Sequence, residues 1–92
     1  MIVSLEVELF LYNCHSLKQK RSVIKRLLAK IQKDFNVAVA ELAYHDLWNW
    51  TTLGFVTIAN EYNHAERTIQ DILKVIDSFT ELECTTTDVE RL

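Results

Sequence analysis

The sequence contains no proline, a single glycine and two cysteines among its 92 residues. Without proline or clustered glycine nothing marks a flexible linker, so we expect one domain over residues 1–92. The same scarcity excludes the glycine-rich loops that cradle phosphates in P-loop and dinucleotide-binding proteins. Cys14 and Cys84 form no CxxC motif and lack metal-site spacing with the three histidines. We therefore expect reduced thiols, no metal and no cofactor.

Signals for export, membrane insertion and catalysis are also missing. The first apolar segment, residues 2–12, is too short and too acidic to span a bilayer, and no secretory leader is recognisable. These absences predict a cytoplasmic protein without a membrane partner. GxSxG and HExxH motifs do not occur, and the neighbours Cys14 and His15 lack the orienting group that a Cys-His pair needs. We therefore predict that the protein is not an enzyme.

The charges are strongly segregated along the chain. Residues 16–35 hold seven of the ten basic residues and one acidic residue, a local charge of +6 within a net charge of −3. A basic segment on an acidic body could attract phosphate groups or an acidic partner.

Hydrophobic periodicity predicts the first two elements. Residues 2–12 alternate strictly, which is typical of a strand with one apolar face. Ser16 is a good N-cap for a helix that follows, in which apolar residues fall on one arc and basic residues on the other. Lys20 is an exception, because it projects from the apolar side; we expect it to reach solvent from the first turn.

The rest of the chain predicts three more strands and one more helix. The strands cover residues 36–43, 51–59 and 81–89, and the third of these is rich in threonine. Asn60 is the candidate cap of a helix over residues 61–79. The order β-α-β-β-α-β predicts an α+β fold of the ferredoxin-like type, with two helices on one face of a four-stranded antiparallel sheet.

This topology would bring distant segments to one edge of the domain. The start of the first helix, residues 16–21, should lie near the connection that carries His45, Trp48 and Trp50. Loops that converge in this way often carry function.

Five short motifs in register resemble a known bacterial family. They are SLKQKR at residues 16–21, FNVAVAE at 35–41, DLW at 46–48, LG at 53–54 and HAER at 64–67. Together they are similar to the YlxP-like proteins, a family described as a domain of unknown function. The resemblance implies a ferredoxin-like fold and no established reaction. Genes of this family often lie beside genes for translation initiation and ribosome maturation, which implies a role near the ribosome.

Three interpretations of the basic helix stand open. Its lysine and arginine side chains could neutralise phosphates of structured RNA or of the ribosome, or the helix could dock an acidic protein. An ordinary solvated helix face explains the same pattern. The candidate nucleic-acid-binding residues are Lys18, Lys20, Arg21, Lys25, Arg26, His45, Trp48 and Trp50.

The two tryptophans have opposite expectations. Trp48 and the preceding Leu47 look like a hydrophobic plug over the end of the core, whereas we expect Trp50 to be exposed and able to stack on an unpaired base.

The uncovered face of the predicted sheet is a second candidate surface. We expect Phe10, Tyr12 and Phe55 to form an apolar patch there, with Leu53 beside them, and such patches often mark a partner surface. Self-association as a homodimer is therefore the alternative function. RNA binding on this face is disfavoured, because Glu6 and Glu8 would repel a phosphate backbone.

Overall fold

Six elements follow one another in the order β-α-β-β-α-β in the computed structural model, which describes residues 1–92. All predicted elements are present, with ends that differ by no more than a residue or two. The strands are β1 (Ile2–Leu11), β2 (Ala38–Ala43), β3 (Trp50–Ile58) and β4 (Leu82–Arg91), and the helices are α1 (Leu17–Asp34) and α2 (Tyr62–Asp77).

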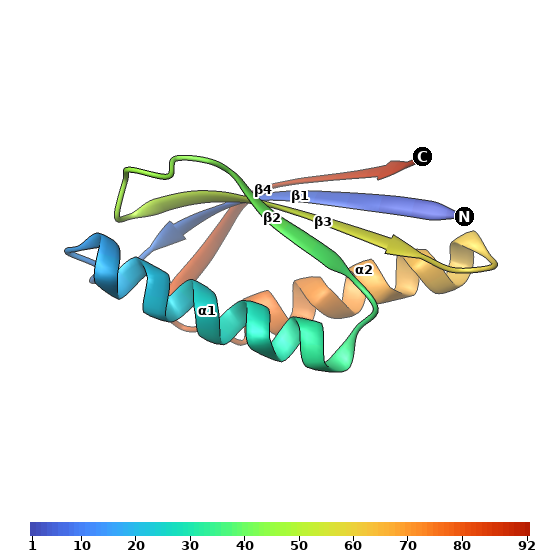
Figure 1. The fold of residues 1–92 in the computed structure, drawn as a ribbon, viewed down its shortest axis with the longest axis horizontal. Helices are drawn as coiled ribbons and strands as arrows, with labels where there is room; N and C mark the ends of the chain where they lie inside the picture. Colours follow the sequence, from blue (N-terminus) through green and yellow to red (C-terminus); the bar gives the residue numbers. More distant parts are fainter.

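The strands form one antiparallel sheet in the order β2-β3-β1-β4. Both helices lie along the same face of this sheet, with α1 on the β2 side (Figure 1). The predicted ferredoxin-like α+β arrangement is therefore confirmed. The edge strands are β2 and β4, and the face opposite the helices is uncovered.

The strict alternation of β1 builds the centre of the core. Val3, Leu5, Val7 and Leu9 face the helices and are buried, because side chains in a strand alternate between the two faces. The helices contribute the other half of this core, through Leu27 and Ile31 of α1 and through Ala65, Ile69, Ile72 and Ile76 of α2.

The two helices begin differently. Ser16 caps α1 as predicted: its Oγ accepts a hydrogen bond from the Gln19 amide at 3.1 Å, and the Gln19 side chain accepts one from the His15 amide at 2.7 Å. These bonds satisfy amides that a helix start leaves unpaired. In α2 the N-cap is Glu61, without a side-chain cap bond, so the prediction that Asn60 caps this helix was wrong.

The orientation of β3 corrects one prediction. Phe55 lies opposite Leu5, and Leu53 lies opposite Val7, so both β3 side chains face the helices and are fully buried. Phe55 therefore belongs to the core and does not join Phe10 on the uncovered face. Residues 51–59 are apolar at both parities, and only pairing with β1 decides which parity faces inward.

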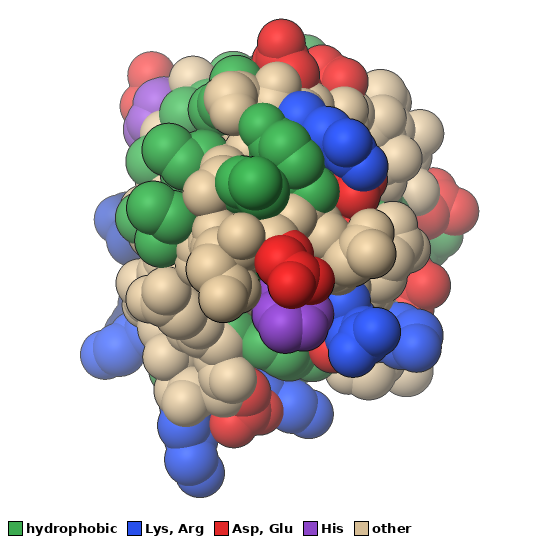
Figure 2. Space-filling view, turned by 90° about the vertical axis from the view of Figure 1, so that its right-hand side faces the viewer, with side chains coloured by type: hydrophobic (Ala, Val, Ile, Leu, Met, Phe, Trp, Pro, Cys, Tyr) green, Lys and Arg blue, Asp and Glu red, His purple; other side chains and the backbone are tan.

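The uncovered face has an apolar half and an acidic half. On the β2 and β3 side, Leu42, Val56 and Ile58 are exposed. On the β1 and β4 side, Glu6 lies directly opposite Asp88. Figure 2, which views the end of the molecule where the chain begins and ends, shows hydrophobic side chains gathered over the sheet layer and Lys and Arg side chains projecting from the helix layer below.

Candidate functional site

The structure brings the start of α1 against the connection between β2 and β3. The side chain that joins them is Lys20, whose Nζ donates hydrogen bonds to the carbonyl oxygens of Tyr44 at 2.7 Å and Leu47 at 2.8 Å. The same Nζ lies 3.0 Å from the Glu41 carboxylate. Three acceptors thus surround one ammonium group, which satisfies its three donors.

Lys20 is 3% exposed, so the prediction that it reaches solvent was wrong, and its ammonium group is engaged within the protein instead of being presented to nucleic acid as expected. A lysine on the apolar arc of a helix was expected to escape the core from the first turn. Instead β2 and the loop that follows close over it, and their acceptors compensate the cost of removing the charge from water. Lys20 is therefore a positioning residue in this edge of the molecule.

Glu41 completes the buried network. Its carboxylate accepts a hydrogen bond from the Thr51 hydroxyl at 2.5 Å and pairs with Lys20. Partial burial raises the pKa of Glu41, but the hydrogen bonds from Thr51 and Lys20 outweigh that effect and leave its pKa below the ordinary value. Glu41 is therefore the charged partner of Lys20 at neutral pH.

Local contacts further restrict the loop at residues 44–49. Tyr44 has a positive φ of 64°, which turns the chain sharply at the end of β2, and its carbonyl also accepts the Leu47 amide at 3.1 Å. The Asn49 carbonyl accepts the Leu11 amide at 2.9 Å, which ties the end of the loop to β1. His45 Nε2 lies 3.2 Å from the Glu41 carbonyl oxygen. The loop is thus held at its start, middle and end.

Both tryptophans differ from their predicted exposure. Trp50 begins β3 and is half-buried, with its ring in edge-to-face contact with Phe10 at 5.2 Å between centroids and 6.4 Å from the Tyr44 ring. Phe10 contacts Tyr12 in the same way, also at 5.2 Å. Trp48 lies within the loop and is 49% exposed, so the predicted plug does not form.

The exposed basic side chains of α1 form two stripes. Lys18, Arg21 and Lys25 lie within an arc of about 60° on the side of β2 and the loop, because successive residues advance about 100° around a helix. Arg26, Lys30 and Lys33 occupy an adjacent arc. In this second stripe Arg26 is paired with the Glu81 carboxylate, and its guanidinium holds the pKa of Glu81 below the ordinary value.

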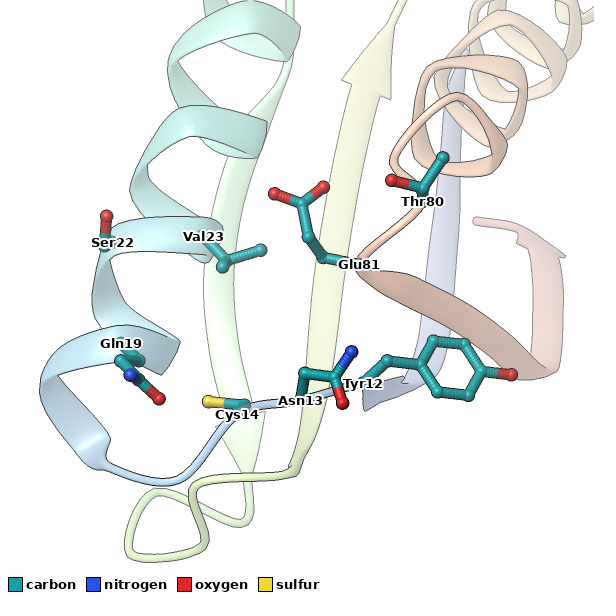
Figure 3. Close-up of a pocket in the computed structure, with 8 residues that line it drawn as sticks. All are labelled: Tyr12, Asn13, Cys14, Gln19, Ser22, Val23, Thr80 and Glu81. Atoms are coloured by element: carbon teal, nitrogen blue, oxygen red, sulfur yellow. The ribbon is translucent and has the colours of Figure 1, made fainter.

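A separate pocket of about 370 Å³ lies between the first turns of α1 and the connection from α2 to β4. In Figure 3 the Cys14 thiol points toward α1 and the Glu81 carboxylate projects into the space between the elements, whereas the Tyr12 ring points away. The thiol donates to the Ser16 carbonyl at 3.5 Å, and the Ser16 hydroxyl is engaged by Gln19. A carboxylate and occupied cap groups make this pocket a poor receptor for an anion.

The structure offers neither a metal site nor a membrane-spanning helix. No cluster of three or more His, Cys, Asp or Glu side chains has the arrangement of a metal site. Neither helix combines the length and the apolar character that crossing a membrane requires.

Comparison with known proteins assigns the chain to a family. The family model "Protein of unknown function (DUF503)" matches residues 2–89. The chain belongs to the DUF503 family. The chain is also 40% identical to YlxP of Bacillus subtilis (strain 168), which is described as uncharacterized. That alignment spans 90 residues and covers 98% of each of the two chains. The resemblance carried by the five motifs is confirmed.

Solved structures support the fold of this DUF503 domain. SnoaB, a cofactor-independent oxygenase from Streptomyces nogalater, has a TM-score of 0.62 at 10% identity, over 99% of this chain and 92% of that one. The de novo designed protein LFR1 1, with a ferredoxin fold, has a TM-score of 0.58 at 13% identity, over 100% and 83% of the two chains. Likeness at such low identity extends to the fold and not to the activity.

Sequence reasoning missed the buried network but had a signal for it. Lys20 falls on the apolar arc of α1 by its spacing from Leu27 and Ile31, and Glu41 alternates with exposed alanines in β2. A basic and an acidic residue, each on the inward face of its own element, are candidates for a buried pair. Nothing in the sequence showed that the loop carbonyls would complete the site.

Proposed function

We propose that this DUF503 protein is a non-enzymatic RNA-binding protein that contacts structured RNA, such as that of the ribosome, through α1 and the loop at residues 44–49. The observation that supports the proposal is the Lys20 network, because it ties the loop that carries the exposed Trp48 to the first turns of α1, the helix of the basic stripe formed by Lys18, Arg21 and Lys25. Phosphate contacts and base stacking are the two usual components of such recognition.

The distribution of charge supports α1 over the sheet as the RNA surface. The basic stripe has few acidic neighbours on α1, whose only acidic residue is Asp34 in the last turn. The uncovered sheet places Glu6 and Asp88 side by side, and carboxylates there would repel phosphate. Phe55, the expected aromatic partner of Phe10 on that face, is buried in the core.

Charge reversal tests the phosphate contacts. Lys18→Glu with Arg21→Glu should abolish cosedimentation with purified bacterial ribosomal subunits at low salt. In binding to a ribosomal RNA hairpin, each lost contact should flatten the salt dependence by about one unit of slope. The matched control is Arg67→Glu with Lys74→Glu, which makes the same charge change at exposed positions of α2. The proposal fails if both double variants stay folded and bind RNA equally.

Stacking has a different signature. Trp48→Ala should weaken binding of the same hairpin by about 1–3 kcal/mol if the ring stacks on an unpaired base, with little change in the salt slope. Because Trp48 is exposed, this replacement should leave the free energy of unfolding within about 0.5 kcal/mol of the wild-type value. Unchanged affinity would remove stacking from the proposal.

Self-association through the uncovered sheet is the second candidate function. It is favoured by the exposed Leu42, Val56 and Ile58, which adjoin one another on β2 and β3. Sedimentation velocity should then find a dimer at micromolar concentration that Val56→Asp with Ile58→Asp converts to a monomer. A wild-type monomer throughout that range would rule this candidate out.

A further inference from the structure

A groove of about 590 Å³ runs between α1 and the edge strand β2. Its α1 wall presents the apolar side chains of Ile24 and Leu28, which are half-buried, and the exposed basic side chains of Arg21 and Lys25. Glu41 lies in the opposite wall, but its charge is paired with Lys20 inside the network. The groove therefore combines an apolar floor with a positively charged rim.

The alternation of hydrogen-bonded and non-bonded residue pairs in the sheet shows which backbone groups face the outer edge of β2. Met1 and Ala59 exchange two hydrogen bonds, at 2.7 and 3.0 Å, just before β1 and after β3. The register between β1 and β3 continues unbroken from that pair. In an antiparallel ladder, bonded and non-bonded pairs alternate. Odd-numbered residues of β3 therefore bond to β1, and even-numbered residues bond to β2.

The outer edge of β2 follows from this alternation. Ala38 and Ala40 lie opposite even-numbered β3 residues and use their amides and carbonyls within the sheet. The backbone groups of Val39 and Glu41 must then point away from the sheet, beside the groove. His45 occupies the Glu41 carbonyl, whereas the Val39 amide and carbonyl and the Glu41 amide have no protein partner. Such an edge is a template for another strand.

We propose that the outer edge of β2 and the groove beside it form a docking site for an extended, acidic segment of another protein, which adds as a fifth strand. Side chains of an added strand alternate between the two faces of the sheet. On the helix side they would meet Ile24 and Leu28 or approach Arg21 and Lys25. The site therefore selects apolar and acidic residues at the helix-facing positions of the segment, which are every second residue, and this selection does not depend on RNA binding.

Charge distinguishes this occupant from a second copy of the chain. Symmetric pairing of two β2 edges would bring two α1 helices together on one face, each within a segment of charge +6. Repulsion between the two positively charged helices would oppose this association. An acidic segment is instead attracted to the same basic side chains. Its backbone amides and carbonyls can also pair with the free Val39 groups, whereas nucleic acid has no peptide backbone that could form such a ladder.

A random-peptide phage library selected on the full-length protein tests the site. Enriched peptides should carry Asp or Glu together with Val, Ile or Leu at every second position and lack central proline. Val39→Pro should weaken the best synthetic peptide about tenfold, because one intermolecular hydrogen bond is lost. Proline is tolerated where an edge amide points outward. The matched control is Thr87→Pro, which should leave the affinity for the peptide unchanged. Thr87 lies opposite Val7, so its amide also points outward, but from the other edge strand, β4.

Arg21→Glu with Lys25→Glu supplies a second variant at exposed positions and should also weaken the peptide about tenfold or more. The proposal is overturned if no peptide is enriched, if enriched peptides are not acidic, or if Val39→Pro and Thr87→Pro bind equally. It is also overturned if the wild-type protein dimerises and Val39→Pro makes it monomeric, which would assign the edge to a second copy. The RNA hairpin can also compete with the peptide for Arg21 and Lys25. If it displaces the peptide while its own affinity is unchanged by Val39→Pro, the two ligands share the basic side chains but only the peptide pairs with β2, which supports the proposal.

Discussion

Replacing Lys20 with methionine should loosen the loop at residues 44–49 while leaving the rest of the fold intact. Methionine preserves most of the apolar stem of the side chain but removes the ammonium group. The carbonyls of Tyr44 and Leu47 and the Glu41 carboxylate then lose a common donor. Leaving acceptors unpaired in a buried site is the physical source of the expected loss.

The magnitude follows from the surroundings of these acceptors. Breaking a fully buried ion pair costs about 3–5 kcal/mol. Here the Glu41 side chain is 29% exposed and retains the Thr51 hydroxyl, so water compensates part of the loss. We therefore expect Lys20→Met to lower the free energy of unfolding by about 1–3 kcal/mol. Lys25→Met, on the exposed side of α1, should change it by no more than about 0.5 kcal/mol.

Two measurements check this expectation. Urea denaturation gives the free energy of unfolding, and acrylamide quenching of fluorescence reports the loop, because Trp48 and Trp50 are the only two tryptophans. Quenching should rise in Lys20→Met, as the half-buried Trp50 loses its contact with Tyr44, and stay at the wild-type level in Lys25→Met. If Lys20→Met matches Lys25→Met in both measurements, the ammonium does not hold the loop and the argument is refuted.

Three other predictions concern the core and the network. Leu27→Ala should cost about 2–5 kcal/mol by urea denaturation, and Leu28→Ala clearly less, because Leu27 is fully buried and Leu28 borders the groove; equal losses would contradict the packing described. Folding lowers the pKa of Glu41, so its charged form stabilises the folded protein. This contribution to the free energy of unfolding is complete above the ordinary pKa near 4.5 and is lost as the pH falls through the pKa of Glu41 in the folded protein. Stability measured from about pH 6 to pH 3 should therefore fall less steeply in Glu41→Gln, and identical profiles would speak against this role. Trp50→Ala should destabilise the protein by about 1–3 kcal/mol without changing the salt slope of RNA binding, and a stable variant would show that the ring contributes little packing.

The sequence by itself determined the elements, their order and the fold class. The alternation in β1 and the helical spacing of apolar residues in α1 and α2 each admit one regular structure, because only one period places the apolar side chains on a common face. Topology then followed from the order β-α-β-β-α-β, and convergence of α1 with the loop after β2 followed from topology. Five motifs in register also carried the family resemblance.

Only the tertiary structure decided the facing of β3, the burial of Lys20 and the exposure of the two tryptophans. A strand that is apolar at both parities has no inward face until its partner sets the register, and this placed Phe55 in the core. A lysine on an apolar arc stays buried only if acceptors from elsewhere meet its ammonium group, and Glu41 and two loop carbonyls provide them. Such compensation joins residues far apart in the chain, so no local pattern of sequence records it.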